Sequence, residues 1–358
     1  MKPVAEATRI AKFSVIIATY QRPDELSRCV RAIGKLVWPR DRLEVIVVND
    51  GGIVHDAEQL KSLAGDVDFR IITTVNTGPG AARNAGAAVA RGQFLTFIDD
   101  DCVPSPDWLQ GLSSAVDRSH DAMVGGRTVN ILKGNLFSQA SQTLVDYVYA
   151  YYNERGAKRN EFFASNNMTL DADAFHAIGG FDESFRTAED RELCKRWGAS
   201  GGRFEYVTDI VIGHAHRLGP MSFLRQHFGY GRGALPYWRK SGANGVRGIR
   251  VEPFSFYLGM LTFPLRQRER YAPILSLLIL VSQISNACGF AYEGLRRVFA
   301  RERVPLIARE AESAVTSSSC QNQGRSAGFC PKAWFFSAFS AFSAVNWSCR
   351  SRRSSSRR

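Results

Sequence analysis

Short apolar runs alternate with amphipathic segments in the N-terminal part of the chain. The apolar runs are rich in β-branched and aromatic residues, which is typical of strands, and they occupy residues 13–20, 43–50, 69–74 and 94–101. Between these runs, residues 24–36 and 79–92 have helical patterns. Strands and helices in alternation predict an α/β fold with a mostly parallel sheet flanked by helices.

The first predicted helix has one apolar face. Leu26, Val30, Ile33 and Val37 form a stripe, and Asp24 stands where an N-terminal acid or cap belongs. We therefore expect this helix to cover one face of the sheet.

A second block follows, from about residue 123 to residue 217. It contains a strand-like run, a tyrosine-rich helical stretch, a loop, a glycine turn and a helix, at residues 123–130, 146–152, 162–171, 179–184 and 188–197. We expect this block to complete the domain that begins at Phe13.

Beyond Gly219 the chain is basic and aromatic at first, and then strongly apolar. Residues 271–295 approach the length of a bilayer-spanning helix, but both flanks are basic and give no orientation. We expect residues 219–312 to form a helical, membrane-associating region, either crossing the bilayer or lying in its interface, with a buried hairpin as the alternative. A crossing is weakened by four polar residues, Ser282, Gln283, Ser285 and Asn286.

The net charge of +12 comes largely from the C-terminus, because residues 316–358 hold seven Lys and Arg residues and no acid. The same segment has twelve serines, so we expect residues 313–358 to be a disordered tail. A solvated basic terminus explains this composition, and no nucleic-acid partner is expected. Residues 1–12 are expected to be a short extension.

The seven cysteines show no C-x-x-C pair, which favours a reducing compartment. The first 13 residues lack an apolar core of signal-peptide length, so we expect no export. The chain is therefore expected to face the cytoplasm.

Polar residues stand at the ends of three predicted strands, at Thr19-Tyr20, Asn49-Asp50 and Asp99 to Asp101. Ligands of open α/β sheets bind at the carboxyl ends of the strands. These ends are expected to meet in one crevice.

Asp99, Asp100 and Asp101 follow a buried strand without a break. A divalent cation, Mg²⁺ or Mn²⁺, would relieve their repulsion and could also hold a diphosphate. A calcium loop does not fit, because Pro104 and Gln110 stand where it needs Gly and Glu. A solvated surface turn is the alternative.

His214 and His216 follow a predicted strand and are spaced to point the same way. Either could complete a metal site with Asp101, since imidazole suits Mn²⁺ better than Mg²⁺. A purely structural pair is the alternative.

Six segments carry a resemblance to a known family. In order they read FSVIIATYQRPDEL, VIVVNDGG, NTGPGAARNAG, FLTFIDDDCVPSPDWL, GGFDES and AEDRELCKRW. Over about residues 13–217 they resemble the bacterial family 2 glycosyltransferases of the GT-A fold. The resemblance implies a domain at 13–218 with a nucleotide half to about residue 122 and an acceptor half after it.

The resemblance also implies roles for single residues. Tyr20 would stack near the nucleotide base, Asp50 would accept a hydrogen bond from the base, and Arg83 would face the ribose or diphosphate, which suits a guanidinium. Asp100 would lie near the ribose, Asp101 would bind the metal, and Asp99 would support them. The nucleotide-sugar-binding set is completed by Ala18 and Arg22.

Asp190 is the implied catalytic base, and Glu189 would orient the acceptor. Both acids stand at an expected exposed helix start whose Leu193, Cys194 and Trp197 face inward, so complementing the helix dipole is the alternative. Asn166 and Asn167 would bind sugar hydroxyls, with loop capping as the alternative.

The implied activity is metal-dependent, inverting hexosyl transfer from a nucleotide-diphosphate sugar to a glycan or lipid-linked acceptor. Transfer is expected to be non-processive, because Leu193 replaces the Gln of the Q-x-x-R-W pattern of processive synthases. Cell-surface glycan synthesis at the cytoplasmic face of the inner membrane fits the C-terminal region. A sugar nucleotidyltransferase and a catalytically decayed nucleotide-sugar-binding membrane protein are the alternatives, whereas a dehydrogenase would need a G-x-G-x-x-G turn.

Overall fold

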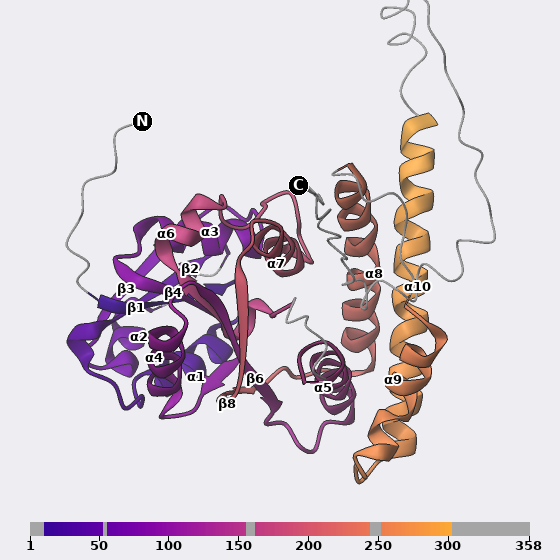
Figure 1. Ribbon diagram of the computed structural model, residues 1–358, viewed down its shortest axis with the longest axis horizontal. Coiled ribbons are helices and arrows are strands. Elements are labelled where there is room, and N and C mark those ends of the chain that lie inside the picture. The colour runs from indigo at the N-terminus through magenta and orange to yellow at the C-terminus, as the bar shows by residue number, and fades with distance from the viewer. Residues whose placement is uncertain (1–10, 53–55, 155–161, 244–251, 303–358) are drawn as a thin grey trace, which may run out of the picture.

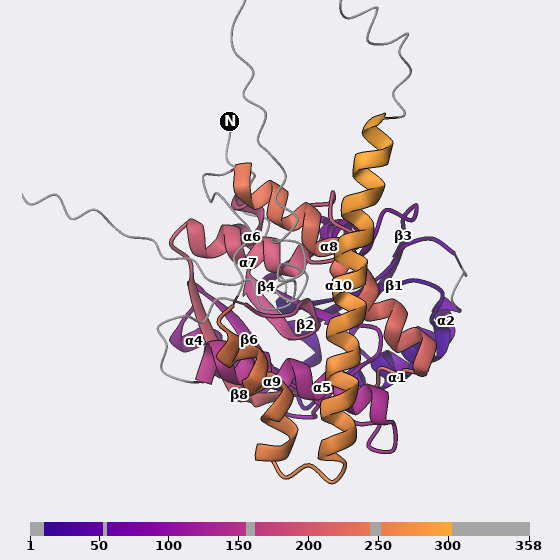
Figure 2. The ribbon, with the colours of Figure 1, turned by 90° about the vertical axis from the view of Figure 1, so that its right-hand side faces the viewer.

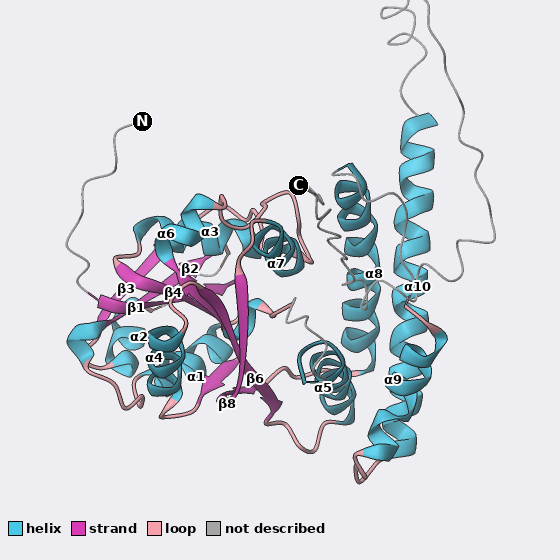
Figure 3. Cartoon of the chain, viewed as in Figure 1, coloured by secondary structure: helices cyan, strands magenta, loops and turns pink. Residues whose placement is uncertain are grey.

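The computed structural model describes residues 11–52, 56–154, 162–243 and 252–302. The predicted N-terminal extension and C-terminal tail lie almost wholly outside these residues. An eight-stranded sheet forms the centre of one half, and long helices stand beside it (Figures 1 and 3).

The strands, in chain order, are β1 Ala11–Thr19, β2 Leu43–Asn49, β3 Asp68–Thr73, β4 Gly92–Asp99, β5 Cys102–Pro104, β6 Ala122–Asn130, β7 Met168–Asp171 and β8 Arg203–His214. Their spatial order is β3-β2-β1-β4-β7-β6-β8-β5. The first four strands in space are parallel, as predicted, whereas β7 pairs antiparallel with both β4 and β6, and β5 pairs antiparallel with β8. The sheet is therefore mixed, although parallel pairs predominate.

The helices are α1 Pro23–Ile33, α2 Ala57–Ala64, α3 Pro79–Val89, α4 Trp108–Arg118, α5 Leu136–Tyr149, α6 Ala172–Ala177, α7 Glu189–Ala199, α8 Pro220–Ala243, α9 Phe254–Arg266 and α10 Ala272–Glu302. Alternate residues of each strand face opposite layers. From β1, Val15 and Ile17 pack with α1, α2 and α4, whereas Ile16 packs with α3, α6 and α7.

Helix α1 confirms most of its predicted apolar face. Leu26, Val30 and Ile33 are fully buried. Val37 lies beyond the end of the helix and is 59% exposed, so its inclusion in the stripe was wrong.

Two strands were not expected. Residues 162–171 were predicted to be a loop, yet β7 at the end of this segment bridges β4 and β6. The three-residue strand β5 follows the aspartates and pairs Cys102 with His214. Both strands are too short to show a period in the sequence, and their pairing partners are distant along the chain.

Helices α8, α9 and α10 stand together beside the sheet domain, next to α5 (Figures 1 and 2). One face of α8 turns toward α10, and Ser285 Oγ of α10 donates to the carbonyl of Leu224 at 2.8 Å. By length and composition, residues Ala272–Arg297 of α10 could cross a membrane.

Candidate active site

A cavity of about 730 Å³ opens at the carboxyl ends of β1, β2 and β4. The start of α7 and the sides of α5 and α8 form the other walls. The cavity is lined by every predicted site residue except Asn167, namely Ala18, Tyr20, Arg22, Asp50, Arg83, Asp99, Asp100, Asp101, Asn166, Glu189, Asp190, His214 and His216.

A single arginine forms ion pairs with two of the three aspartates. Arg22 Nη1 lies 2.7 Å from Asp100 Oδ1, and Nη2 lies 2.8 Å from Asp101 Oδ2. Thr19 Oγ1 also donates to Asp100, at 2.8 Å. Burial nevertheless raises the pKa of Asp100 to about 7.

Asp101 faces both histidines. Its Oδ1 lies 3.1 Å from His214 Nε2, and its Oδ2 lies 3.4 Å from His216 Nδ1. The histidines reach this position because β5 pairs with β8, and because the Ala215 amide donates to the Asp101 carbonyl at 2.9 Å. A residue 113 positions further along the chain is thereby placed against the aspartate turn.

These three side chains fit a divalent cation. Their ligand atoms all lie within 4.8 Å of one another. Asp101 Oδ1 is buried and accepts no hydrogen bond from the described part of the chain, although His214 Nε2 is close to it. Two imidazole nitrogens and a carboxylate form a donor set for a divalent metal ion.

Arg83 connects the two sides of the cavity. It is buried in α3, where Nη1 donates to Glu189 at 2.9 Å and Nη2 donates to Asp99 at 2.7 Å. Glu189 is also buried, so the predicted exposed helix start is wrong for this residue. Its ion pair with Arg83 makes that burial possible.

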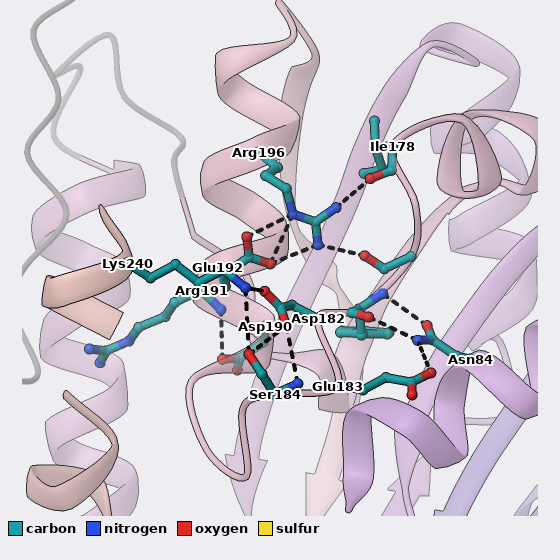
Figure 4. A network of polar contacts seen from close by, with 12 residues as sticks. Asn84, Ile178, Asp182, Glu183, Ser184, Asp190, Arg191, Glu192, Arg196 and Lys240 are labelled. Carbon is teal, nitrogen blue, oxygen red and sulfur yellow. Dashed lines mark hydrogen bonds and ion pairs between the residues drawn. The ribbon is translucent and has the colours of Figure 1, made fainter. Parts of the chain in front are cut away.

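Asp190 stands beside Glu189 at the start of α7, after Ala188 in the left-handed conformation. Its carboxylate accepts a hydrogen bond from the Arg191 amide at 2.7 Å (Figure 4). Burial and the neighbouring charge of Glu189 raise the pKa of Asp190 to about 7. A carboxylate with this pKa is well suited to accept a proton near neutral pH. Helix α7 buries Leu193, Cys194 and Trp197, as predicted.

Asp50 and Tyr20 line the cavity directly after the ends of β2 and β1. The Asp50 carboxylate accepts hydrogen bonds from the amides of Thr77 at 3.0 Å and Gly78 at 2.9 Å. It therefore fastens the segment that leads into α3, where Gly78 has a φ of 110°. Tyr20 is 44% exposed.

The two adjacent asparagines face different surroundings. Asn166 lines the cavity, and its side chain contacts Thr128 at 3.4 Å. Asn167 is buried, accepts from Trp108 Nε1 at 3.1 Å and donates to the Ile210 carbonyl at 3.2 Å. Its amide is thus occupied in joining α4 to β8.

The wall formed by α5 and α8 was not predicted. Its residues are mixed apolar and aromatic, with a few polar groups: Ser138, Gln142, Val145, Val148, Tyr149, Gln226, Tyr230, Ala234 and Tyr237. The four on α8 follow one another at intervals of three or four positions. This helical spacing within the basic, aromatic stretch could have identified them. Arg186, which donates to Asn76 at 3.0 Å, was also missed.

Three elements fasten residues 178–184, the segment before α7 (Figure 4). Asn84 of α3 bonds both the amide and the carbonyl of Phe181, each at 2.8 Å. Arg196 of α7 donates to the carbonyls of Ile178 and Gly180. Lys240 of α8 pairs with Asp182. The start of α7 is therefore held from the sheet domain and from α8 at once.

Comparisons with known proteins identify glycosyltransferases as similar proteins. A family model described as glycosyl transferase family 2 matches residues 14–181. Glycosyltransferase AglE of Haloferax volcanii is 25% identical over 63% of this chain and 73% of that protein. Pre-mycofactocin glycosyltransferase of Mycobacterium tuberculosis is 27% identical over 56% of this chain, which spans only 44% of that protein.

Among solved structures, a similar one is mannosyltransferase PcManGT from Pyrobaculum calidifontis, in complex with GDP-Man and Mn²⁺. The match covers 93% of this chain and 86% of that one, with a TM-score of 0.53 and 16% sequence identity. At this identity the likeness concerns the fold.

Proposed function

We propose that the chain, whose residues 14–181 match the model of glycosyl transferase family 2, is an inverting, non-processive hexosyltransferase that uses a nucleotide-diphosphate sugar. The observation that carries the proposal is the pairing of two chemical sites in one cavity. Asp101, His214 and His216 lie at one wall, and Asp190 lies at the start of α7. The GDP-Man and Mn²⁺ bound by the structural relative support the donor class.

In the proposed reaction the Asp190 carboxylate accepts the proton of the acceptor hydroxyl. The hydroxyl oxygen attacks the anomeric carbon as the bond from that carbon to the diphosphate oxygen breaks, which inverts the configuration. Tyr20, Arg22 and Arg83 would hold the nucleotide side of the donor. A divalent cation on Asp101, His214 and His216 would supply positive charge for the diphosphate.

The acceptor is proposed to enter along α5 and α8. Val145, Val148 and Ala234 give this wall an apolar part, and Tyr149, Tyr230 and Tyr237 give it rings on which a sugar or an isoprenoid can pack. A lipid-linked or cell-surface glycan at the cytoplasmic face of a membrane fits such a wall.

The test is a panel of nucleotide sugars with and without Mn²⁺, read out as nucleoside diphosphate release and as donor binding. Asp190→Asn should bind donor normally and slow transfer by roughly 100- to 10,000-fold, because a general base contributes that much. Asp101→Asn should lose metal-dependent donor binding. Asp209→Asn, which changes an exposed carboxylate on β8, is the matched control and should behave as the wild type.

Transfer that survives both Asp101→Asn and Asp190→Asn would contradict these roles. Metal-dependent donor binding by the wild type without turnover on any donor would instead favour a decayed binding protein.

A further inference from the structure

Helix α10 has an apolar exposed face, unlike an amphipathic helix of a water-soluble protein. Between residues 273 and 295 the exposed positions carry no charged side chain and are apolar or aromatic: Pro273, Ile274, Leu277, Leu280, Ile284, Cys288, Tyr292 and Leu295. They recur every three or four residues, apart from adjacent Pro273 and Ile274, and so share one face. The polar residues of the same stretch turn inward, since Ser282, Gln283, Asn286 and Glu293 are all at most 3% exposed.

This arrangement is costly in water. An amphipathic helix normally buries its apolar stripe and exposes its polar one. Large exposed apolar patches mark sites where a protein binds another protein or a membrane. Helix α9 packs beside α10 and also exposes large apolar residues, since Phe254, Leu258 and Leu265 are 78%, 49% and 51% exposed. We name these exposed residues of α9 and α10 together the outer apolar face.

The turn between α9 and α10 is basic. Arg266, Arg268 and Arg270 are exposed there, beside one acid, Glu269. Arg296 and Arg297 stand near the other end of the face, where they pair with Glu293. An anionic lipid bilayer has an apolar interior beneath a layer of negatively charged headgroups. An apolar face bordered by arginines is complementary to such a surface.

The packing of α10 decides how it can meet a bilayer. Its inner face lies directly on α8, where a Cβ added to Gly231 would stand 1.9 Å from the Asn286 carbonyl oxygen. At Gly289 an added Cβ would stand 2.0 Å from the Phe228 carbonyl oxygen. A crossing α10 would therefore carry α8 into the hydrocarbon, together with its exposed Arg225 and Arg232.

We propose that the outer apolar face of α9 and α10 docks in the plane of an anionic lipid bilayer, without crossing it. The apolar side chains enter the boundary between headgroups and acyl chains, and the arginines of the turn bind lipid phosphates. Helix α8 stays above the membrane, between the lipid and the cavity.

The test is flotation of the full chain with vesicles of phosphatidylcholine, alone or mixed with phosphatidylglycerol. The wild type should float with the mixed vesicles. Leu277→Gln should weaken binding roughly tenfold, as expected for one large apolar side chain. Val37→Gln is the matched control, because Val37 is also 59% exposed but lies on the sheet domain, and it should bind as the wild type.

The charge contribution has its own variant. Arg266→Gln combined with Arg270→Gln should weaken binding to the mixed vesicles by roughly 25-fold, at about fivefold per arginine near an anionic surface, and this loss should shrink as salt rises. Binding that is equally tight to neutral vesicles would overturn the anionic requirement.

Two further results would overturn the proposal. If the wild type does not float and Leu277→Gln converts a dimer to a monomer, the face is a contact between two copies of the chain. Retention in the vesicles after washing with alkaline carbonate would indicate a crossing helix. Vesicle binding needs no donor or acceptor, so its failure would leave the proposed transferase activity untouched.

Discussion

At the scale of residues, Asp101 and Asp190 are two carboxylates of the cavity that lie in opposite environments. Asp101 is surrounded by cations and potential cations, since Arg22, His214 and His216 all lie within 3.4 Å of it. Asp190 instead lies beside another carboxylate. Such a difference separates a carboxylate that stays ionised from one that gains and loses a proton.

The raised pKa of Asp190 predicts the pH dependence of transfer. A base works only when ionised, so the rate should rise about tenfold per pH unit below pH 7 and level off above it. Turnover from pH 5.5 to 9, with donor and Mn²⁺ saturating, measures this. Donor binding over the same range is the control, and a midpoint near pH 4 would contradict the role of Asp190.

The histidines predict a metal affinity that can be measured without turnover. His214→Gln and His216→Gln should each weaken Mn²⁺ binding at least tenfold, because even the loss of an outer-shell partner typically costs 10- to 100-fold. Electron paramagnetic resonance of free Mn²⁺ during a protein titration gives the affinity. His120→Gln, an exposed histidine elsewhere, should leave it unchanged. Equal affinities in all three variants would assign the pair a structural role.

At the scale of elements, α8 directly contacts the loop that leads into α7. A Cβ added to Gly233 would stand 1.8 Å from Thr187 Oγ1, two residues before Glu189. The glycine therefore lets α8 approach the loop that leads into α7.

Gly233→Ala should push this loop away and lower the free energy of unfolding by about 1–3 kcal/mol, as overpacking does. It should also slow transfer, because Asp190 moves with the loop. Gly229→Ala is the control on the same helix, since nothing lies within 4 Å of its added Cβ, and it should stabilise α8 by roughly 0.5–1 kcal/mol. Urea unfolding and turnover of both variants check the pair, and equal effects would contradict the close contact.

The elements also show what could be predicted from the sequence. Strands such as β1 and β4 are long apolar runs, so their pattern identifies them. The four-residue β7 and three-residue β5 show no such pattern, because their conformation comes from pairing with β4, β6 and β8. The convergence of His214 with Asp101 depends on β5, so the sequence predicts the histidines as candidate partners of Asp101 but not the strand pairing that brings them together.

At the scale of the whole molecule, function and stability oppose each other at Asp190. Its pKa is raised in the folded state, so the folded protein holds a proton that the unfolded chain releases between about pH 4 and pH 7. Stability contributed by this group therefore falls as pH rises through that window.

Asp190→Asn removes this titration. The free energy of unfolding of the variant should increase relative to that of the wild type as the pH rises from 4 to 7. Above pH 7 the difference between the two should stay constant. Urea denaturation at several pH values measures the difference. A variant that loses stability relative to the wild type as pH rises would show that Asp190 is stabilised as a carboxylate in the folded protein.

The packing of helices α8 to α10 against the sheet domain could not be predicted from the sequence. The stretch 225–240 is basic and aromatic, which is compatible with a surface as well as with a wall. Only packing reveals that Tyr230 and Tyr237 line the cavity while Phe228 and Gly231 contact α10.

Helices α10 and α8 thus form a partition two helices thick between the outer apolar face and the cavity, each helix being about 10–12 Å across. With the outer apolar face on a bilayer, an acceptor anchored in the same leaflet would reach the cavity by spanning only these two helices. Enzyme and acceptor would then meet by diffusion in two dimensions. Turnover would follow the number of acceptors per unit of lipid area, so adding inert lipid should dilute the substrate even when its bulk concentration is unchanged.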